Sequence, residues 1–156
     1  NVQGILTDAG IQTFTPAQGK PKDTKVDLVR RAMTRARLAE YPISGVVIHP
    51  LDWEDIELLK GNDDHYIWTQ VTVGGEMRLW RAPVVETTAI NEGEFLLGDW
   101  RVGAHLWDLE RASVQVGTVN DQFIRNELTL LGEEDVIFTT ELPRAFVRGD
   151  LVPASS

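Results

Sequence analysis

The sequence predicts an α+β domain, and three observations support this. Apolar residues recur at a spacing of three and four after residue 24, which is typical of a helix. The continuous apolar run Gly45–Ile48 is typical of a strand buried on both faces. From residue 69 onward, short apolar segments alternate with Gly, Asn, Asp and Pro, which indicates a series of strands. The length of 156 residues suits about one domain with a sizeable core.

The first helix is expected to run from a cap at Thr24 to the region of Tyr41. Thr24 and Asp27 have the spacing of a capping box, in which each side chain binds the other residue's backbone. Pro42 disfavours helical geometry in the residue before it and so ends the helix. The expected buried stripe consists of Val26, Val29, Ala32, Met33 and Ala36.

A second, short helix is expected after the strand at 45–48. Asp52 has the pattern of its N-cap, with Asp55 three residues later and Gly61 after its last turn. Trp53 and an apolar stripe after it face inward on this interpretation. His49, which precedes Pro50, is expected to be a turn histidine that hydrogen-bonds the backbone.

The second half of the chain is expected to be mostly strands. One segment, 120–131, fits a helix and a strand equally well by its period, and both assignments stay open at this level. Gly74-Gly75 indicates a hairpin between the first two strands. The expected strands are 69–73, 77–80, 83–87, 94–97, 113–116, 136–139 and 145–147.

Composition excludes several classes of protein and site. The chain has no cysteine, which excludes disulfides, thiolate-bound metals and cysteine nucleophiles. No apolar run approaches the roughly 20 residues of a membrane-spanning helix. The N-terminal residues do not have the pattern of a signal peptide. The chain begins with Asn1 rather than Met, and we interpret it as a processed form or a fragment.

Charge is unevenly distributed along the chain. Residues 1–48 carry seven Lys and Arg against four Asp and Glu, whereas residues 49–156 carry eight against twenty, for a net charge of −9. The acidic segment 49–156 is a poor ligand for nucleic-acid phosphates, because like charges repel. The acidic surface is expected to be solvated, or to meet a basic patch on a neighbouring copy.

No motif indicates catalysis or cofactor binding. None of the three histidines stands in a metal-binding spacing, and no phosphate-binding glycine motif is present. The acidic run at Glu133 is expected to be ordinary surface; buried, it could supply a base. Because Trp and Arg concentrate at the centres of protein contacts, we expect a surface suited to association. The candidates for subunit contacts are Arg30, Arg31, Arg35, Arg37, Trp68 and Trp80.

Six segments occur in an order that matches a known family. They are SGVVIHPLDWEDIELLKGNDDHYIW, LWRAPVVETTAI, GEFLLGDW, HLWDLERASVQV, FIRNELTLLGEEDV and LPRAFVRG. As a set, from about Gly4 to Gly149, they resemble the C-terminal half of tailed-phage major capsid proteins with the HK-ninety-seven-like fold. One departure is Arg81-Ala82 before Pro83, because the family often has Gly two residues before this Pro, so the local turn is expected to differ.

The resemblance implies a division of the chain into three parts. Residues 23–118 resemble the axial domain, which has a mixed sheet flanked by helices and packs around the five-fold and six-fold axes of a shell. Residues 1–22 resemble a connecting segment from the peripheral domain, and residues 119–156 its return segment and tail. On this interpretation, residues 126–131 form a strand rather than a helix.

The implied function is that of a structural major capsid protein of a tailed bacteriophage or prophage. It would assemble into pentamers and hexamers of an icosahedral shell that encloses DNA without sequence-specific binding. Assembly would take place in the cytoplasm of the bacterial host, and the product would be a virion component. Portal or scaffolding proteins are further implied partners, whereas no cofactor, metal, membrane or small-molecule substrate is expected. An encapsulin-type protein compartment is the alternative shell.

Two residues match a covalent cross-link found in one type of family member. There an asparagine of one subunit joins a lysine of the next, with a glutamate as proton acceptor. The matching positions are Asn126 and Glu133, for which we favour a structural role over cross-linking, and the chain is otherwise not expected to be an enzyme. A small enzyme that uses Glu133 as a carboxylate base is the least favoured alternative.

Overall fold

The computed structural model describes residues 4–15, 23–60 and 76–151, which form two compact units. Unit 1 consists of Asn1–Ala104 and Thr140–Ser156, and unit 2 of His105–Thr139. The expected α+β content with a mixed sheet is confirmed. The expected strand at 69–73, the hairpin glycines 74 and 75, Gly61 and Trp68 lie outside the described residues.

Unit 1 is built on a six-stranded mixed sheet, with the order β1-β8-β5-β2-β4-β3 among the described residues. The pairs β1–β8 and β2–β4 are parallel, and the other neighbours are antiparallel. Its strands are β1 (Gln12–Phe14), β2 (Gly45–Ile48), β3 (Arg78–Leu79), β4 (Ala82–Glu86), β5 (Glu94–Gly98) and β8 (Phe146–Asp150). The central strands β2 and β5 have the apolar sequences that the pattern predicted.

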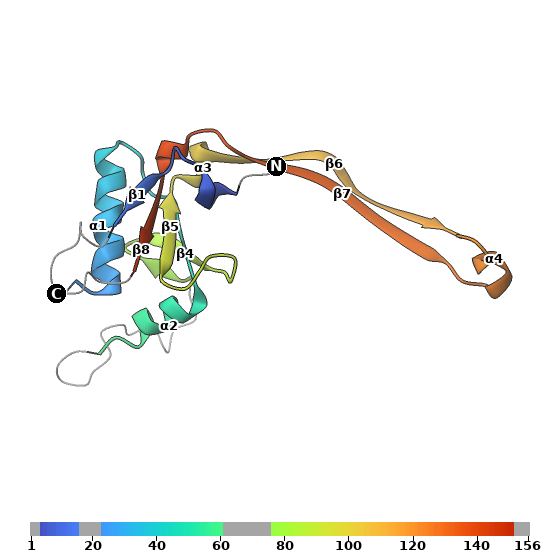
Figure 1. The fold of residues 1–156 in the computed structure, drawn as a ribbon, viewed down its shortest axis with the longest axis horizontal. Coiled ribbons are helices and arrows are strands. Elements are labelled where there is room, and N and C mark those ends of the chain that lie inside the picture. The colour runs from blue at the N-terminus through green and yellow to red at the C-terminus, as the bar shows by residue number, and fades with distance from the viewer. Residues whose placement is uncertain (1–3, 16–22, 61–75, 152–156) are drawn as a thin grey trace. The chain divides into compact units, whose positions relative to one another are not determined.

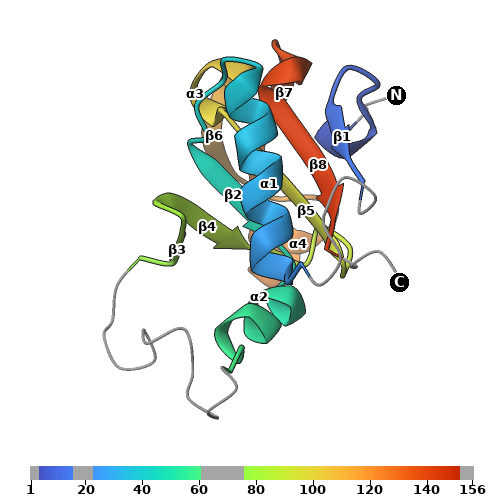
Figure 2. The same cartoon turned by 90° about the vertical axis from the view of Figure 1, so that its left-hand side faces the viewer.

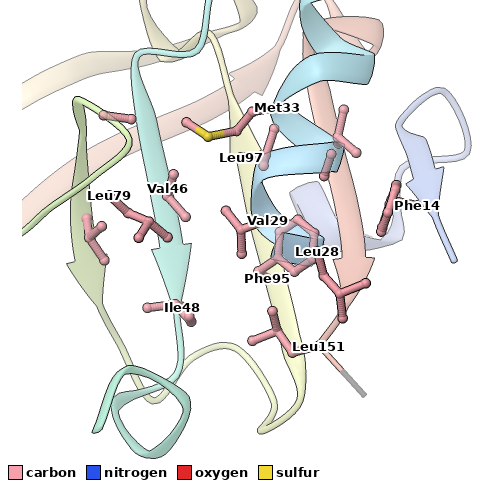
Figure 3. Close-up of a cluster of buried hydrophobic side chains, with 14 of the residues drawn as sticks. Phe14, Leu28, Val29, Met33, Val46, Ile48, Leu79, Phe95, Leu97 and Leu151 are labelled. Atoms are coloured by element: carbon pink, nitrogen blue, oxygen red, sulfur yellow. The ribbon is translucent and has the colours of Figure 1, made fainter. Parts of the chain in front are cut away.

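Helix α1 (Lys25–Leu38) lies across one face of this sheet (Figure 2). Its start follows the prediction: Thr24 Oγ1 accepts a hydrogen bond from Asp27 N–H, and Asp27 Oδ2 accepts one from Thr24 N–H at 2.9 Å. The buried residues of the helix pack against the inner strands, and Figure 3 shows several of them beside Phe95 and Leu97 of β5. These buried residues are Leu28, Val29, Ala32, Met33 and Ala36.

Helix α2 (Pro50–Glu57) begins earlier than predicted. The expected N-cap, Asp52, is wrong, because His49 occupies that position and its Nδ1 accepts a hydrogen bond from Leu51 N–H at 3.3 Å. Pro50 stands at the first helical position, where its missing N–H is tolerated. The expectation that His49 binds backbone is therefore confirmed, and Asp52 is left for a different contact.

The opposite face of the sheet carries a smaller apolar cluster. Phe146 of β8 and Leu96 of β5 are buried there, and the Trp100 ring meets Phe146 edge-on, with ring centroids 5.0 Å apart. Trp100 begins the short helix α3 (Trp100–Gly103), for which the Asp99 side chain is the cap. The described part of the unit also contains two 3-10 helices, η1 (Ile5–Thr7) and η4 (Pro143–Ala145).

Unit 2 belongs to a two-stranded ribbon formed by β6 (Ala104–Gly117) and β7 (Thr129–Thr140), with α4 (Gln122–Arg125) between them (Figure 1). Both strands are much longer than the predicted 113–116 and 136–139, because charged residues interrupt the apolar pattern without interrupting the pairing. The predicted strand at 126–131 begins only at Thr129, and α4 takes up part of the preceding segment. Asn126 follows α4 with a φ of 57°.

The predicted axial and peripheral parts refer to positions within a shell, so a single chain leaves that assignment a prediction. The contacts within the chain divide it differently. β1 and β8, which come from the segments assigned to the peripheral domain, pair with each other, and β8 also pairs with β5 of the sheet in unit 1.

Candidate functional site

The four arginines of α1 lie on two sides of the helix rather than on one surface. Arg31 and Arg35 border a hollow together with Phe14 of β1. Arg30 and Arg37 border a second hollow on the side of the β3–β4 turn. The helix therefore carries two separate basic edges.

Arg31 is committed to an ion pair within its own chain. Its Nε lies 2.5 Å from Asp23 Oδ2 and its second guanidinium nitrogen 3.0 Å from Asp23 Oδ1, so the contact is bidentate. This hydrogen bonding raises the pKa of Arg31, against the smaller opposing effect of desolvation. The pair holds the segment before α1 against the helix, which favours a structural role for Arg31.

Arg30 and Arg37 border the same hollow as an exposed tryptophan, Trp80. Trp80 is 50% exposed, and the Arg30 guanidinium carbon lies 5.7 Å from the centre of its ring, in the range of a cation–π contact. Arg81 borders the same hollow of about 250 Å³. We call Arg30, Arg37, Trp80 and Arg81 the arginine–tryptophan surface. It joins three predicted contact candidates, whereas Trp68 lies outside the described residues.

The backbone that presents this surface is unusual. Trp80 and Arg81 form the two-residue turn between β3 and β4, and their φ angles are 50° and 74°. A turn with positive φ at both central positions is normally made by Asn-Gly or similar residues, because a Cβ is disfavoured there. Arg81 was not among the predicted contact residues, although its place beside Trp80 before Pro83 could have drawn attention to it.

A second charged cluster, around Asp52, is internal. Lys25 Nζ lies 2.7 Å from Asp52 Oδ1 and 2.6 Å from Asp55 Oδ2, and Asp52 Oδ2 accepts a hydrogen bond from Gly93 N–H at 2.7 Å. Asp52 is fully buried. Desolvation alone would lower the pKa of Lys25, but hydrogen bonds and attraction to the two carboxylates outweigh it and leave that pKa raised. The contacts of Asp52 therefore support a structural role for this residue.

Unit 2 exposes apolar side chains along both strands. None of its described side chains is buried, so the unit has no apolar core among them. Trp107 Nε1 donates a hydrogen bond across the ribbon to Thr139 Oγ1 at 3.0 Å. The large exposed apolar residues are Leu106, Trp107, Leu109, Val114, Val116, Val119, Ile124, Leu128, Leu130, Leu131, Val136, Ile137 and Phe138.

The two residues of the predicted cross-link lie in this same unit. Asn126 is exposed after α4, and Glu133 is exposed within β7. The neighbouring Glu134 and Asp135 are exposed as well, as the surface interpretation of the acidic run expects. Within the described part of the chain, no group of three or more His, Asp or Glu side chains could hold a metal ion. No helix among these residues is long and apolar enough to cross a membrane.

Comparison with known proteins decides the family. The sequence matches the Phage capsid family over residues 1–151. The chain belongs to the phage capsid family. A curated relative, the major capsid protein of Enterobacteria phage HK97, is 34% identical over 128 residues, which are 81% of this chain and 33% of that protein. This member of the phage capsid family therefore spans about a third of the length of the curated relative that it matches.

Solved structures agree with the family assignment at the level of the fold. The capsid of a native GTA particle matches with a TM-score of 0.72 at 15% identity, covering 96% of this chain and 60% of that one. Gordonia phage Cozz matches with a TM-score of 0.66 at 17% identity, covering 97% and 52%. The SrpI encapsulin of Synechococcus elongatus PCC 7942 is more distant, with a TM-score of 0.51 at 14% identity and coverage of 98% and 57%. The predicted phage capsid fold is confirmed.

Proposed function

We propose that this chain is the shell-forming portion of the major capsid protein of a tailed phage or prophage. In this role it assembles with copies of itself into pentamers and hexamers of an icosahedral shell that encloses DNA. The observation that carries the proposal is the ribbon of β6 and β7, because it exposes apolar side chains on both strands and has no core of its own among the described residues. An isolated two-stranded ribbon is marginally stable in water, so other protein segments have to cover it.

The net charge of −9 agrees with a structural shell protein rather than with a DNA-binding one. Enclosed DNA would be confined by the closed shell and not bound through its bases or phosphates, since an acidic protein gains little from phosphate contacts. We further propose that assembly takes place in the host cytoplasm and that portal or scaffolding proteins take part. The encapsulin-type compartment is less well supported, because the encapsulin likeness is weaker than the likeness to the capsids named above.

Covalent cross-linking through Asn126 and Glu133 stays a prediction. A glutamate accepts a proton from a lysine ammonium more readily when it is desolvated, and Glu133 is exposed in the single chain. The chemistry would therefore require a neighbouring subunit to cover β7 around Glu133. Denaturing gels of assembled particles test this: covalent ladders that disappear in Glu133→Gln would support cross-linking, and their absence from the wild type would contradict it.

Native mass spectrometry tests the proposed function. Because the chain spans a third of its curated relative, the experiment uses the product of the complete gene. We expect pentamers, hexamers or larger assemblies whose masses are multiples of one subunit. A protein that stays monomeric at high concentration, while folded by circular dichroism, would contradict the proposal. Genes for a portal, a terminase and a protease beside this gene would favour a phage shell over an encapsulin.

A further inference from the structure

We infer that the arginine–tryptophan surface is the docking site for the acidic helix α2 of a second copy of this chain. The inference rests on the proposed function, because it names one surface through which copies of a shell protein meet. Its parts are three guanidinium groups around a half-exposed indole ring on one side, and the carboxylates of α2 on the other.

The first argument is unbalanced positive charge. Arg78, next to the turn, is neutralised by Glu76, whose Oε2 accepts hydrogen bonds from two of its guanidinium nitrogens at 3.1 and 2.6 Å. By contrast, Arg30, Arg37 and Arg81 have no carboxylate partner among the residues that the structure describes. Three neighbouring cations that no carboxylate among the described residues neutralises, in a chain of net charge −9, favour an acidic protein surface as the partner.

The second argument is the strained turn that presents Trp80. Residues with a Cβ avoid positive φ, yet Trp80 and Arg81 both adopt it and hold the indole half exposed at the edge of the sheet. Strain of this kind persists where the residues concerned have a use, and Trp and Arg are the residues that most often dominate binding at protein interfaces. The pairing of Leu79 with Ala82 imposes a two-residue turn, and the presence of Trp and Arg in it, where Asn-Gly is usual, is what favours a contact role.

The third argument is that a chain cannot neutralise this surface with its own α2. Lys25, at the first turn of α1, contacts Asp52 and Asp55 of α2, so α2 lies against the N-terminal end of α1. Arg37 stands twelve residues further along, which is about 18 Å at the rise of an α-helix. That separation is far beyond the reach of an ion pair, so any α2 carboxylate that meets Arg37 belongs to a different copy.

Helix α2 has the matching chemistry. Glu54 is exposed and Glu57 is half-buried, and the two carboxylates stand three residues apart on the helix, whereas Asp55 between them is paired with Lys25. A contact between two different surfaces of identical chains is head-to-tail, and such a contact closes into a ring when the rotation per subunit allows it. Rings of this kind are what the proposed pentamers and hexamers require.

Nucleic acid is the alternative anionic partner for this surface. One face of the Trp80 ring already meets Arg30, which leaves less of the indole for base stacking, and the acidity of the whole chain opposes phosphate binding. We therefore assign the surface to protein carboxylates and treat DNA binding as an outcome that the experiment can detect.

Charge reversal in the complete gene product tests the inference. One variant carries Arg37→Glu with Arg81→Glu, a second carries Glu54→Arg with Glu57→Arg, and a third carries all four changes. Native mass spectrometry and sedimentation give the concentration at which half of the protein is assembled. We expect that concentration to rise by about tenfold or more in each of the first two variants. The third variant should return to within about threefold of the wild type, because the charges are complementary again.

Matched controls and a measurement without substitutions keep the result specific. Arg101→Glu and Glu92→Arg each reverse one charge of the corresponding sign at exposed positions outside both surfaces and should leave assembly unchanged. Assembly of the wild type should weaken as salt is raised, which holds even if a variant fails to fold.

Four results would overturn the inference. If the first two variants assemble at the same concentration as the wild type, this contact is rejected and the proposed function is left standing. If the third variant, which carries all four changes, is folded by circular dichroism but does not recover assembly, α2 is rejected as the partner. Binding of a single-stranded oligonucleotide that Arg37→Glu with Arg81→Glu abolishes, without an effect on assembly, would assign the surface to nucleic acid. A wild type that never assembles would contradict the proposed function and the inference together.

Discussion

Asp52 is a buried carboxylate whose two oxygens tie together three separate parts of the chain. One oxygen meets Lys25 at the start of α1, the other accepts the N–H of Gly93 before β5, and the residue itself belongs to α2. A buried carboxylate is stable only when its charge is paired and its oxygens are hydrogen-bonded. This residue therefore fixes where α2 lies in unit 1.

Replacement of Asp52 by Asn should destabilise the protein. The amide oxygen can still accept from Gly93, but the charge that balances Lys25 is lost at a buried site, so we expect the free energy of unfolding in urea to fall by about 2 kcal/mol. Glu54→Gln, at an exposed position of the same helix, serves as the control and should change it by less than about 0.5 kcal/mol. Equal effects of the two substitutions would refute the structural role of Asp52.

Lys25 should make stability depend on alkaline pH. Its pKa is raised in the folded state by Asp52 and Asp55, so its contribution is complete below the ordinary lysine pKa of about 10.4 and is lost as the pH rises through the folded value. Lys25→Arg keeps its positive charge throughout this range. We expect the free energy of unfolding to fall more steeply above about pH 10 in the wild type than in Lys25→Arg. Parallel pH profiles would be evidence against this coupling.

The role of Asp52 shows why residue-level prediction from sequence is incomplete. Asp52 and Asp55 fit a helix start by local pattern, but the histidine imidazole of His49 caps the helix instead. Asp52 is bound by groups 27 and 41 residues away in the chain, and no local spacing contains that information. The capping box at Thr24 was predictable because both of its partners lie within four residues.

At the scale of elements, the turn between β3 and β4 is the feature in which local preference and observed conformation disagree most. Both central residues have positive φ, although neither is glycine or asparagine. The expected strand at 83–87 is found nearly in place as β4, but nothing in the sequence pattern predicted this turn type. Turn geometry follows here from strand pairing, in which Leu79 faces Ala82 and leaves only two residues to connect them.

Arg81→Gly should stabilise the turn. Glycine adopts positive φ without the steric cost that a Cβ imposes. This gain exceeds the loss of stability that comes from the greater conformational entropy of glycine in the unfolded chain, so we expect about 0.5–1 kcal/mol of added stability. Arg81→Ala is the matched control, because it removes the same charged group and keeps the Cβ. Thermal and urea unfolding should therefore separate the two variants, and an equal gain from Ala would rule out backbone strain as the cause.

At the scale of the whole molecule, the two units differ in how they are stabilised. Unit 1 has a continuous apolar core between α1 and the sheet, and helical spacing predicted four of the five buried residues of α1. The ribbon of unit 2 has no buried described side chain, and its strand lengths were underestimated from sequence. Alternation of apolar and polar residues is a weak signal where a strand is covered by partners outside the chain, which is the situation that we propose for the ribbon.

Hydrogen exchange should reveal this difference in the isolated chain. Amides in β6 and β7 are expected to exchange faster than those in β2 and β5, because opening of the ribbon exposes little additional apolar surface. Mass spectrometry of peptides from each strand measures this directly. Protection of the ribbon equal to that of the central sheet would mean that the ribbon is stable without partners.

Electron microscopy of particles assembled from the complete gene product tests the central claim most directly, namely that this chain works by building a shell. The account predicts closed shells in which unit 1 surrounds the five-fold axes and both strands of the ribbon are covered by other protein segments. Folded protein that forms no closed particle under any assembly condition, or shells in which the ribbon lies bare in solvent, would contradict it.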